Sequence, residues 1–236
     1  MKKLALLLAA GVFTFAACKK NDSNPAPGTG PTAKLMFMHG VITSDSIKVK
    51  VNDTLQNSVP SLYFKKITPY TNLRAGSNVK LTFYNPANPA LDSFAIFQGI
   101  TANKNYSVFL AGANAASKSV VFVEDDLTAP TSGMAKIRFV NLSPDPGFDN
   151  LTAVLTNTAT TNVLALDSNI SFKEVTPFFQ VPAATYSVKI GKPSIFTFKE
   201  QPNQQLLSGK IYTYVLTGIQ TIGTNELVLN PPVMNN

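Results

Sequence analysis

Two stretches of this sequence repeat one pattern: FKKITPYTNLRAGSNVKL at residues 64–81 and FKEVTPFFQVPAATYSVKI at residues 172–190. Each begins with an aromatic residue, contains a Thr-Pro pair and leads into a segment in which apolar and polar residues alternate. Proline fixes φ near about −65° and pushes the preceding residue toward extended backbone. Alternation with a period of two is typical of a strand with one buried face. The pattern predicts a repeated β-scaffold element and not a shared active site, because Lys66 in one copy corresponds to Glu174 in the other.

Two further pairs of segments match and occur in the same order along the chain. AKLMF at residues 33–37 corresponds to AKIRF at residues 135–139, and NYSVFLAG at residues 105–112 corresponds to IYTYVLTG at residues 211–218. Self-similarity in an unchanged order is the signature of a duplicated structural unit. We therefore expect two tandem copies of one domain.

Both copies are rich in short β-type segments. Asn52 and Asp53 stand where a hairpin turn is expected, and no window of ten or more residues beyond the N-terminal segment shows a clear helical period. Runs of β-branched and aromatic residues occur at 47–51, 79–84, 106–110, 120–123, 151–155, 186–190 and 212–216. The predicted fold is all-β, with two tandem antiparallel β-sandwich domains over residues 33–132 and 133–236. Both the immunoglobulin-like and the transthyretin-like forms fit this pattern.

The N-terminus, MKKLALLLAAGVFTFAAC, has the plan of a secretory signal, with two lysines before a short apolar run. Residues 1–17 form this predicted signal peptide, and the apolar run is too short to span a membrane. FAAC resembles the lipobox of bacterial lipoproteins, which implies that Cys18 is lipidated and anchors the protein to a membrane. Residues 18–32, rich in Pro, Gly, Ser and Asn, would form a flexible spacer. We expect a cell-envelope location, with the outer membrane favoured and the periplasmic or surface face left open.

Composition excludes several functions. The chain has 20 Lys and Arg against 13 Asp and Glu, a net charge of +7, but no run of Lys or Arg longer than two. Scattered basic residues give no nucleic-acid footprint, so no nucleic-acid partner is expected. Because Cys18 is the only cysteine, no internal disulfide can form. At 44% hydrophobic residues, the chain is expected to be stabilised by a packed core.

A family resemblance centres on the segment EDDLTAPTSGMAKIRFVNLSPDPGFDN, residues 124–150. It is similar to the repeat junction of the extracytoplasmic proteins called the domain of unknown function 4397 family, with E-D-x-x-x-A-P-x-x-G followed by R-x-V/F-[HN]-x-S-P-D. The resemblance implies a β-sandwich module of envelope proteins with no established enzymatic activity. It supplies no substrate. The first copy departs from the pattern, since HGVITSD at residues 39–45 replaces the S-P-D element.

Candidate catalytic and metal-binding residues are few. His39 is the only histidine, and the second copy has Asn141 at the equivalent position, so a catalytic triad is not expected. One histidine and one cysteine supply too few ligands for zinc or copper, and no phosphate-binding glycine loop occurs. Calcium stays open only as a weak alternative, because the acidic residues at 124–126, 145 and 149 do not have the spacing of an EF-hand loop. No metal and no cofactor are expected.

Contact residues are expected where the two copies differ, in HGVITSD and NLSPDPGFD. The candidates are His39, Asp45, Asn141, Asp145 and Asp149. We therefore expect a non-catalytic, lipid-anchored binding or adhesion module whose partner is an envelope protein or a surface polymer. A structural subunit of an envelope complex and a carboxylate-based envelope hydrolase are the alternatives, and the hydrolase is the weaker of the two because the chain contains no tryptophan.

Overall fold

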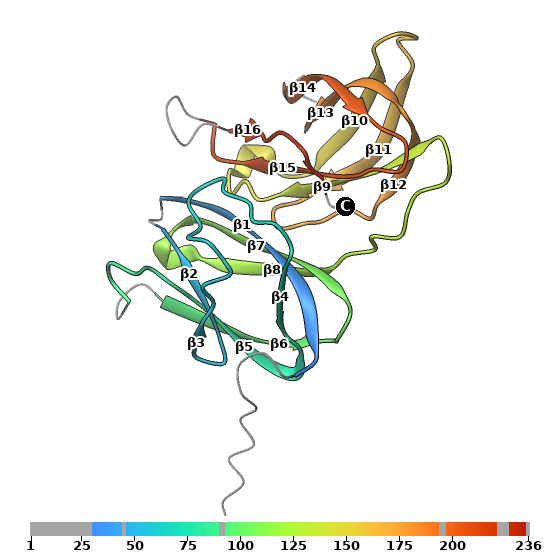
Figure 1. Cartoon of the computed structure of the whole chain (residues 1–236). Coiled ribbons are helices and arrows are strands. Elements are labelled where there is room, and N and C mark those ends of the chain that lie inside the picture. Colours follow the sequence, from blue (N-terminus) through green and yellow to red (C-terminus); the bar gives the residue numbers. More distant parts are fainter. Residues whose placement is uncertain (1–29, 44–45, 90–92, 194–196, 221–226, 235–236) are drawn as a thin grey trace, which may run out of the picture. The chain divides into compact units, whose positions relative to one another are not determined.

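The computed structural model describes residues 30–43, 46–89, 93–193, 197–220 and 227–234 (Figure 1). The predicted signal peptide, Cys18, most of the predicted spacer and Asp45 lie outside these residues. Residues 31–236 group into one compact unit. In the described part of the chain, neither of the two short helical turns has the length and apolar character needed to cross a membrane.

The first repeat contains eight strands and one helical turn. They are β1 (Thr32–Thr43), β2 (Lys48–Val51), β3 (Thr54–Leu55), β4 (Thr71–Arg74), β5 (Gly76–Tyr84), β6 (Ser93–Ile100), β7 (Asn105–Asn114), η1 (Ala115–Ser117) and β8 (Ser119–Glu124). They form two sheets, of order β4-β1-β7-β8 and β3-β2-β5-β6. Asn52 and Asp53 have φ values of 47° and 64°, so they form the hairpin turn that the sequence predicts.

The second repeat has the same strand order. Its elements are β9 (Met134–Asn141), η2 (Pro146–Phe148), β10 (Leu151–Asn157), β11 (Val163–Ile170), β12 (Phe179–Pro182), β13 (Ala184–Lys192), β14 (Thr197–Leu206), β15 (Ile211–Thr217), β16 (Val228–Leu229) and β17 (Val233–Met234). The sheets are β12-β9-β15-β16, in which β17 also pairs with β15, and β11-β10-β13-β14. Among the described strands, each pair joins strands of one repeat.

This topology decides between the two sandwich types that the sequence left open. In the immunoglobulin constant domain, the first strand shares a sheet with the second, fourth and fifth strands. Here the first strand of each repeat shares a sheet with the fourth, seventh and eighth. The immunoglobulin order is therefore excluded, and the transthyretin-like alternative fits.

The all-β sandwich prediction is confirmed, with one parallel strand pair in each repeat. β1 pairs with β7 in parallel, and β9 pairs with β15 in parallel; the other pairs are antiparallel. Parallel neighbours need a long connection, and here the intervening strands supply it. Hydrophobic periodicity says nothing about strand direction, so the sequence could not reveal this pair.

The repeated Thr-Pro segments hold equivalent positions and make equivalent hydrogen bonds. The hydroxyl of Thr68 accepts the N–H of Phe37, and the hydroxyl of Thr176 accepts the N–H of Phe139, both at 3.0 Å. The Thr68 N–H donates to the Phe37 carbonyl and the Thr176 N–H to the Phe139 carbonyl. Each segment then enters an edge strand, β4 or β12. The scaffold interpretation of the repeated phrase agrees with these contacts.

Each sandwich has its own apolar core, and both cores follow the predicted alternation. In β5, Val79, Leu81 and Phe83 are buried in the first core. In β13, Val188 and Ile190 are buried in the second. A third cluster of buried apolar residues lies outside both cores, and the next section begins there.

Candidate functional site

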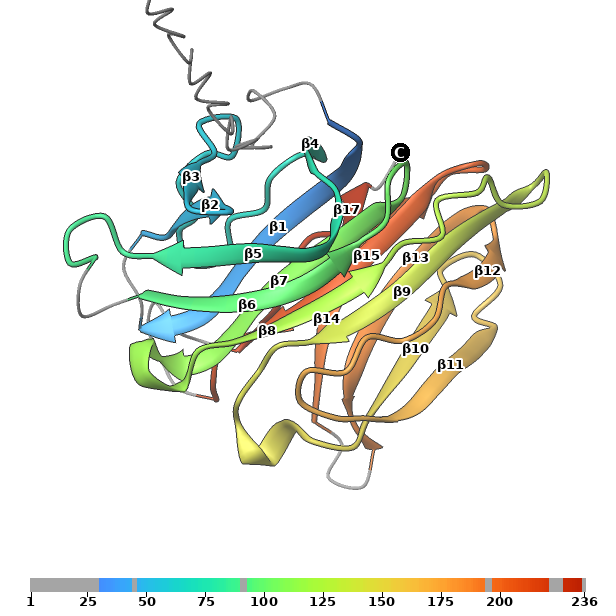
Figure 2. The ribbon, with the colours of Figure 1, turned by 90° about the horizontal axis from the view of Figure 1, so that it is seen from below.

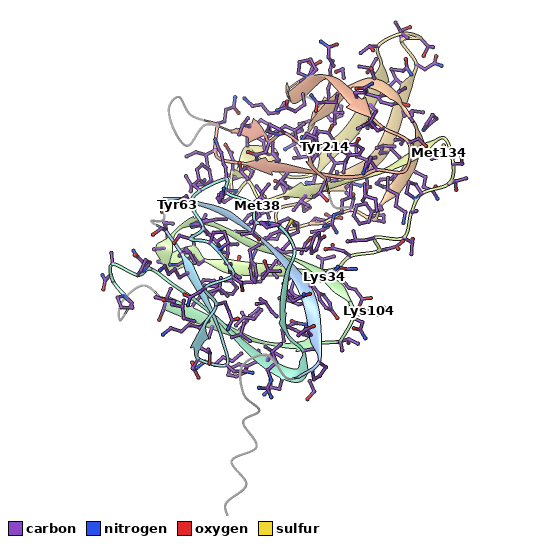
Figure 3. The ribbon with its side chains drawn as sticks, in the orientation of Figure 1. Lys34, Met38, Tyr63, Lys104, Met134 and Tyr214 are labelled. Carbon is purple, nitrogen blue, oxygen red and sulfur yellow. The ribbon has the colours of Figure 1, made fainter. Side chains whose placement is uncertain are left out.

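The two sandwiches meet through the third apolar cluster, between the sheets β4-β1-β7-β8 and β12-β9-β15-β16 (Figure 3). In β1, Leu35 and Phe37 face the core of the first sandwich, whereas Met36 and Met38 belong to the third cluster. The buried members of this cluster are Met36, Met38, Phe109, Ala111, Val140, Leu142 and Val215. Because both faces of β1 are covered, residues 35–42 are buried without interruption.

Strands β1 and β9 run in the same direction across this contact (Figure 2). A Cβ atom placed on Gly40 would lie 2.8 Å from Leu142 Cδ1. Four residues earlier in each strand, Met36 pairs with Ser107, whose Oγ accepts a hydrogen bond of 2.8 Å from Arg138. These two contacts lie four residues apart along β1, and their partners Arg138 and Leu142 also lie four residues apart in the same order. The two strands therefore run in the same direction. The segments that follow β1 and β9 therefore emerge at one end of the folded unit.

We call this the loop end. It comprises the described residues of 41–47, 63–67 and 112–118 in the first repeat and of 142–150, 171–175 and 217–220 in the second. The beginning of β1 at Thr32 lies at the opposite end, next to Lys104, to which the chain is hydrogen-bonded through Lys34. The two loops that the sequence singled out as different between the copies are thus brought to the same end.

His39 and Asn141 occupy equivalent positions and are both 0% exposed. The Nδ1 atom of His39 accepts the N–H of Val41 at 3.1 Å. The side chain of Asn141 accepts the N–H of Ser143 and donates to the Phe148 carbonyl, both at 3.0 Å. The His39 side chain therefore bonds within β1, the Asn141 side chain shapes the turn that follows β9, and neither reaches solvent.

Asp145 and Asp149 are partly exposed and also organise the loop end. The Oδ1 atom of Asp145 accepts the N–H of Gly147 at 2.9 Å, capping the turn η2, and Oδ2 accepts the N–H of Gln220 at 2.6 Å. The Oδ1 atom of Asp149 accepts the N–H of Phe172 at 3.1 Å. These carboxylates hold three loops of the second repeat together. Asp45 lies outside the described residues, so its expected role stays a prediction.

A buried ion pair joins the two repeats. Arg138 in β9 and Asp125 after β8 have side chains that are 2% and 0% exposed, and Nη1 lies 2.6 Å from Oδ1. That Oδ1 atom makes no aligned hydrogen bond, so its contact with Arg138 is one of charge. The Oδ2 atom accepts hydroxyl hydrogen bonds from Tyr70 at 2.6 Å and Ser107 at 2.7 Å. Buried charges of this kind are tolerated only when they are paired and hydrogen-bonded.

The surroundings of this pair are nearly symmetric. Arg138 donates to Ser107 through Nη2 and to Thr213 through Nε, and these two hydroxyl residues hold equivalent positions in β7 and β15. Tyr70, which binds Asp125, is equivalent to Phe178, whose ring centre lies 4.4 Å from the Arg138 guanidinium. Equivalent residues from both repeats thus enclose one unsymmetric ion pair. We call the set Arg138, Asp125, Ser107, Thr213, Tyr70 and Phe178 the interdomain lock.

Sequence reasoning did not find this lock, although one signal was present. Arg138 is flanked by apolar residues in the stretch IRFV, residues 137–140, and these neighbours belong to a buried strand. The first repeat has Met36 at the equivalent position, as a buried strand is expected to have. An arginine is almost never fully buried without a partner. That mismatch could have indicated a buried acidic partner, but nothing in the sequence said which one.

The surface beside the lock carries charges that are already paired. A depression of about 620 Å³ is lined by Lys104, Asn105 and residues 124–128. Lys104 lies 2.7 Å from Glu124, and Lys136 lies 2.9 Å from Asp126. Hydrogen bonds from Thr128 and Lys136 lower the pKa of Asp126 from 3.8 to about 2. Within the described residues, no group of three or more His, Cys, Asp or Glu side chains is placed to hold a metal ion.

Comparison with known proteins assigns a family. The model of the family described as "Domain of unknown function (DUF4397)" matches residues 33–149, a span that contains the first repeat, Asp125 and Arg138. The predicted resemblance to this family is confirmed over these residues. No curated protein sequence matches the chain.

Two solved structures are similar over most of the chain. One is a leucine-rich repeat protein from Bacteroides thetaiotaomicron VPI-5482, with 13% identity over 83% of this chain and 26% of the other, at a TM-score of 0.21. The other is a putative cell adhesion protein from Bacteroides ovatus ATCC 8483, with 11% identity over 85% of this chain and 96% of the other, also at a TM-score of 0.21. This chain therefore spans about a quarter of the first protein. Likenesses at these scores carry no functional argument.

Proposed function

We propose that this protein is a non-catalytic binding or adhesion module of the cell envelope, held to a membrane by a lipid on Cys18. The observation that carries the proposal is the placement of the two ends. β1 begins at one end of the folded unit, whereas the loops that differ between the copies emerge together at the other. A spacer attached before Thr32 would join the folded unit at the end opposite to the loop end.

The interdomain lock supports this role because it makes the loop end a single surface. The two repeats are joined by an apolar cluster and a buried ion pair, so their loops are held at fixed positions relative to one another. Loops on a rigid β-scaffold are the common location of binding residues. A composite surface of two non-identical loop sets suits one extended partner, either an envelope protein or a surface polymer.

Exposed side chains at the loop end provide contacts for such a partner. Tyr63 is 59% exposed, which is unusual for a large aromatic residue. Lys66, Lys173 and Glu174 are also exposed there. Tyrosine is enriched at recognition surfaces because it combines apolar area with a hydroxyl group. Since Lys66 and Glu174 hold equivalent positions with opposite charge, the two halves of the surface are electrostatically distinct.

Photo-crosslinking in intact cells tests the binding surface. A photoreactive phenylalanine analogue is placed at Tyr63 or Lys173 on the loop end, or at Lys104 on the opposite end as a matched exposed control (Figure 3). We expect crosslinked products from Tyr63 and Lys173 but not from Lys104. Products from Lys104 alone would refute the proposed orientation. A single stoichiometric protein partner would instead favour the structural-subunit alternative.

Membrane attachment has a separate test. The variant Cys18→Ser should move from the membrane fraction to the soluble fraction after cell lysis, because the only cysteine that could carry the lipid is gone. If Cys18→Ser still sediments with membranes after a high-salt wash, the lipid anchor is wrong. Protease treatment of intact cells then decides whether the protein faces the surface or the periplasm.

A further inference from the structure

Strand β6 is an unprotected sheet edge. Among the strands that the structure describes, it is the last of the sheet β3-β2-β5-β6 and pairs with β5 alone. Its sequence, SFAIFQGI, has no charged residue and no proline over residues 93–100. Natural proteins usually protect edges with charges, proline, bulges or short strands, because unpaired backbone groups recruit another strand. The one irregularity in the pairing of β6 lies near its end, between the partners Gly76 and Val79 on β5.

The equivalent edge in the second repeat is protected. Strand β14 holds the same position in the sheet β11-β10-β13-β14 and reads TFKEQPNQQL. It contains Lys199, Glu200 and Pro202, and Asn203 has a left-handed φ of 54°. Its pairing with β13 is also shifted between Tyr186 and Val188. Because the two repeats share one fold, the absence of charged residues and proline from β6 is specific to the first repeat.

The side chains of β6 leave apolar surface exposed on both faces of the strand. Phe97 on the outer face is 63% exposed. Phe94 and Ile96 on the inner face pack against the core of the first sandwich but are only partly buried. Another strand beside β6 would cover all three side chains, since cross-strand neighbours on one face contact each other.

We propose that β6 pairs with β6 of a second copy of this chain, antiparallel and about a two-fold axis. Such pairing joins two four-stranded sheets into one continuous sheet. The two-fold axis uses both free edges at once, so the assembly closes as a dimer.

The charge of β6 itself does not oppose pairing with a second copy. The chain has a net charge of +7, so two copies repel each other except where uncharged surfaces meet. In antiparallel self-pairing, a charged strand would place like charges opposite each other, which is destabilising, and β6 has none. Lys80 of β5 pairs with Phe97, so the two Lys80 residues would be three strand spacings apart, about 14 Å. That exceeds the Debye length of about 8 Å at physiological salt, so their repulsion is screened.

A self-complementary register is available. Pairing centred on Ile96 places Ala95 opposite Phe97 of the second copy, so that a small side chain lies beside a large one on the outer face. In this register, even-numbered residues of one copy pair with even-numbered residues of the other. The side chains that face the core in one copy therefore lie beside those that face the core in the other copy. A contact of one strand pair is smaller than a standard interface, so the dimer should dissociate on dilution.

The test uses the full chain in its own cells, expressed as two differently tagged copies. A photoreactive phenylalanine analogue at Phe97 should give a crosslinked product of twice the chain mass that carries both tags. Ala95→Lys, on the exposed face of β6, should reduce this product at least tenfold. The matched control Gln205→Lys, exposed on β14, should leave it unchanged.

Several results would overturn the proposal. One is a product at Phe97 that contains another protein in place of the second tag, and another is the absence of any product. Equal yields from Ala95→Lys and Gln205→Lys would do the same. Ser93→Lys, at the other end of the exposed face, gives an independent variant if Ala95→Lys lowers the thermal midpoint below that of Gln205→Lys. Concentration-dependent sedimentation of the purified full chain should show a dimer that Ser93→Lys weakens.

Discussion

The interdomain lock makes a quantitative prediction about stability. Arg138→Met replaces the arginine with the residue that the first repeat carries at the equivalent position, Met36. The substitution leaves the Asp125 carboxylate, whose side chain is 0% exposed, without its counter-charge. Removing one partner of a buried ion pair costs about 3–5 kcal/mol. We expect Arg138→Met to lower the free energy of unfolding by that amount, and Asp125→Asn to lower it similarly by leaving the arginine unpaired.

A double-mutant cycle separates the ion pair from its other contacts. Asparagine at position 125 keeps an oxygen that can accept from Tyr70 and Ser107, so the double variant loses the charges but retains acceptors. The double variant should therefore lose less free energy of unfolding than the two single variants lose together. We expect the difference to be about 2 kcal/mol or more, which is within the range for residues in one network. Urea unfolding of chains that also carry Cys18→Ser, followed by circular dichroism, measures each value.

An exposed ion pair in the same chain is the control. Lys104 and Glu124 lie 2.7 Å apart, nearly the same distance as the buried pair, but their side chains are 52% and 49% exposed. Their coupling should be much smaller than that of the buried pair, because solvent screens exposed pairs. The reasoning is refuted if Arg138→Met costs less than about 1 kcal/mol, or if the two single costs simply add.

Three further predictions test the fold and its electrostatics. Thr176→Val and Thr68→Val each remove the acceptor of a buried N–H and should cost about 1–3 kcal/mol in urea unfolding; clearly unequal costs would contradict the equivalence of the repeats. Gly40→Ala should cost about 1–3 kcal/mol in thermal or urea unfolding, because its Cβ would lie 2.8 Å from both the Leu110 carbonyl oxygen and Leu142 Cδ1; an unchanged stability would show that these atoms lie farther from Gly40. Asp126 should titrate at a pKa of about 2 by NMR, so its stabilising contribution is present at neutral pH and is lost as the pH falls from about 4 to about 2. Thr128→Val should raise this pKa toward 3.8, and an unchanged value would disprove the assigned cause.

Much of the fold could be predicted from local patterns. Alternation in residues 79–84 and 186–190 placed strands correctly, since the period of two follows from the geometry of the strand itself. The Asn52-Asp53 hairpin was also predictable, because both residues tolerate positive φ. The parallel pairing of β1 with β7 was not, because it depends on which distant strands become neighbours.

The candidate site, too, could be predicted from the sequence only in part. The sequence indicated that the loops after AKLMF and AKIRF differ between the copies, and the structure brings both loops to one end. It did not indicate that His39 and Asn141 are fully buried, since their burial depends on how each sandwich packs around its first strand. The candidate contact residues, Asp45 included, stay predictions for a partner yet to be identified.

The sequence by itself determined that the chain is duplicated and that it is all-β, whereas the export signal stays a prediction. These properties depend on residue order, on alternation and on composition, which act within short segments. Only the tertiary structure decided that Arg138 and Asp125 form one buried pair and that the aromatic residues after the two Thr-Pro pairs, Tyr70 and Phe178, enclose it. The physical reason is that a buried charge is stable only beside its counter-charge, and the folding of two separate sandwiches brings these residues together.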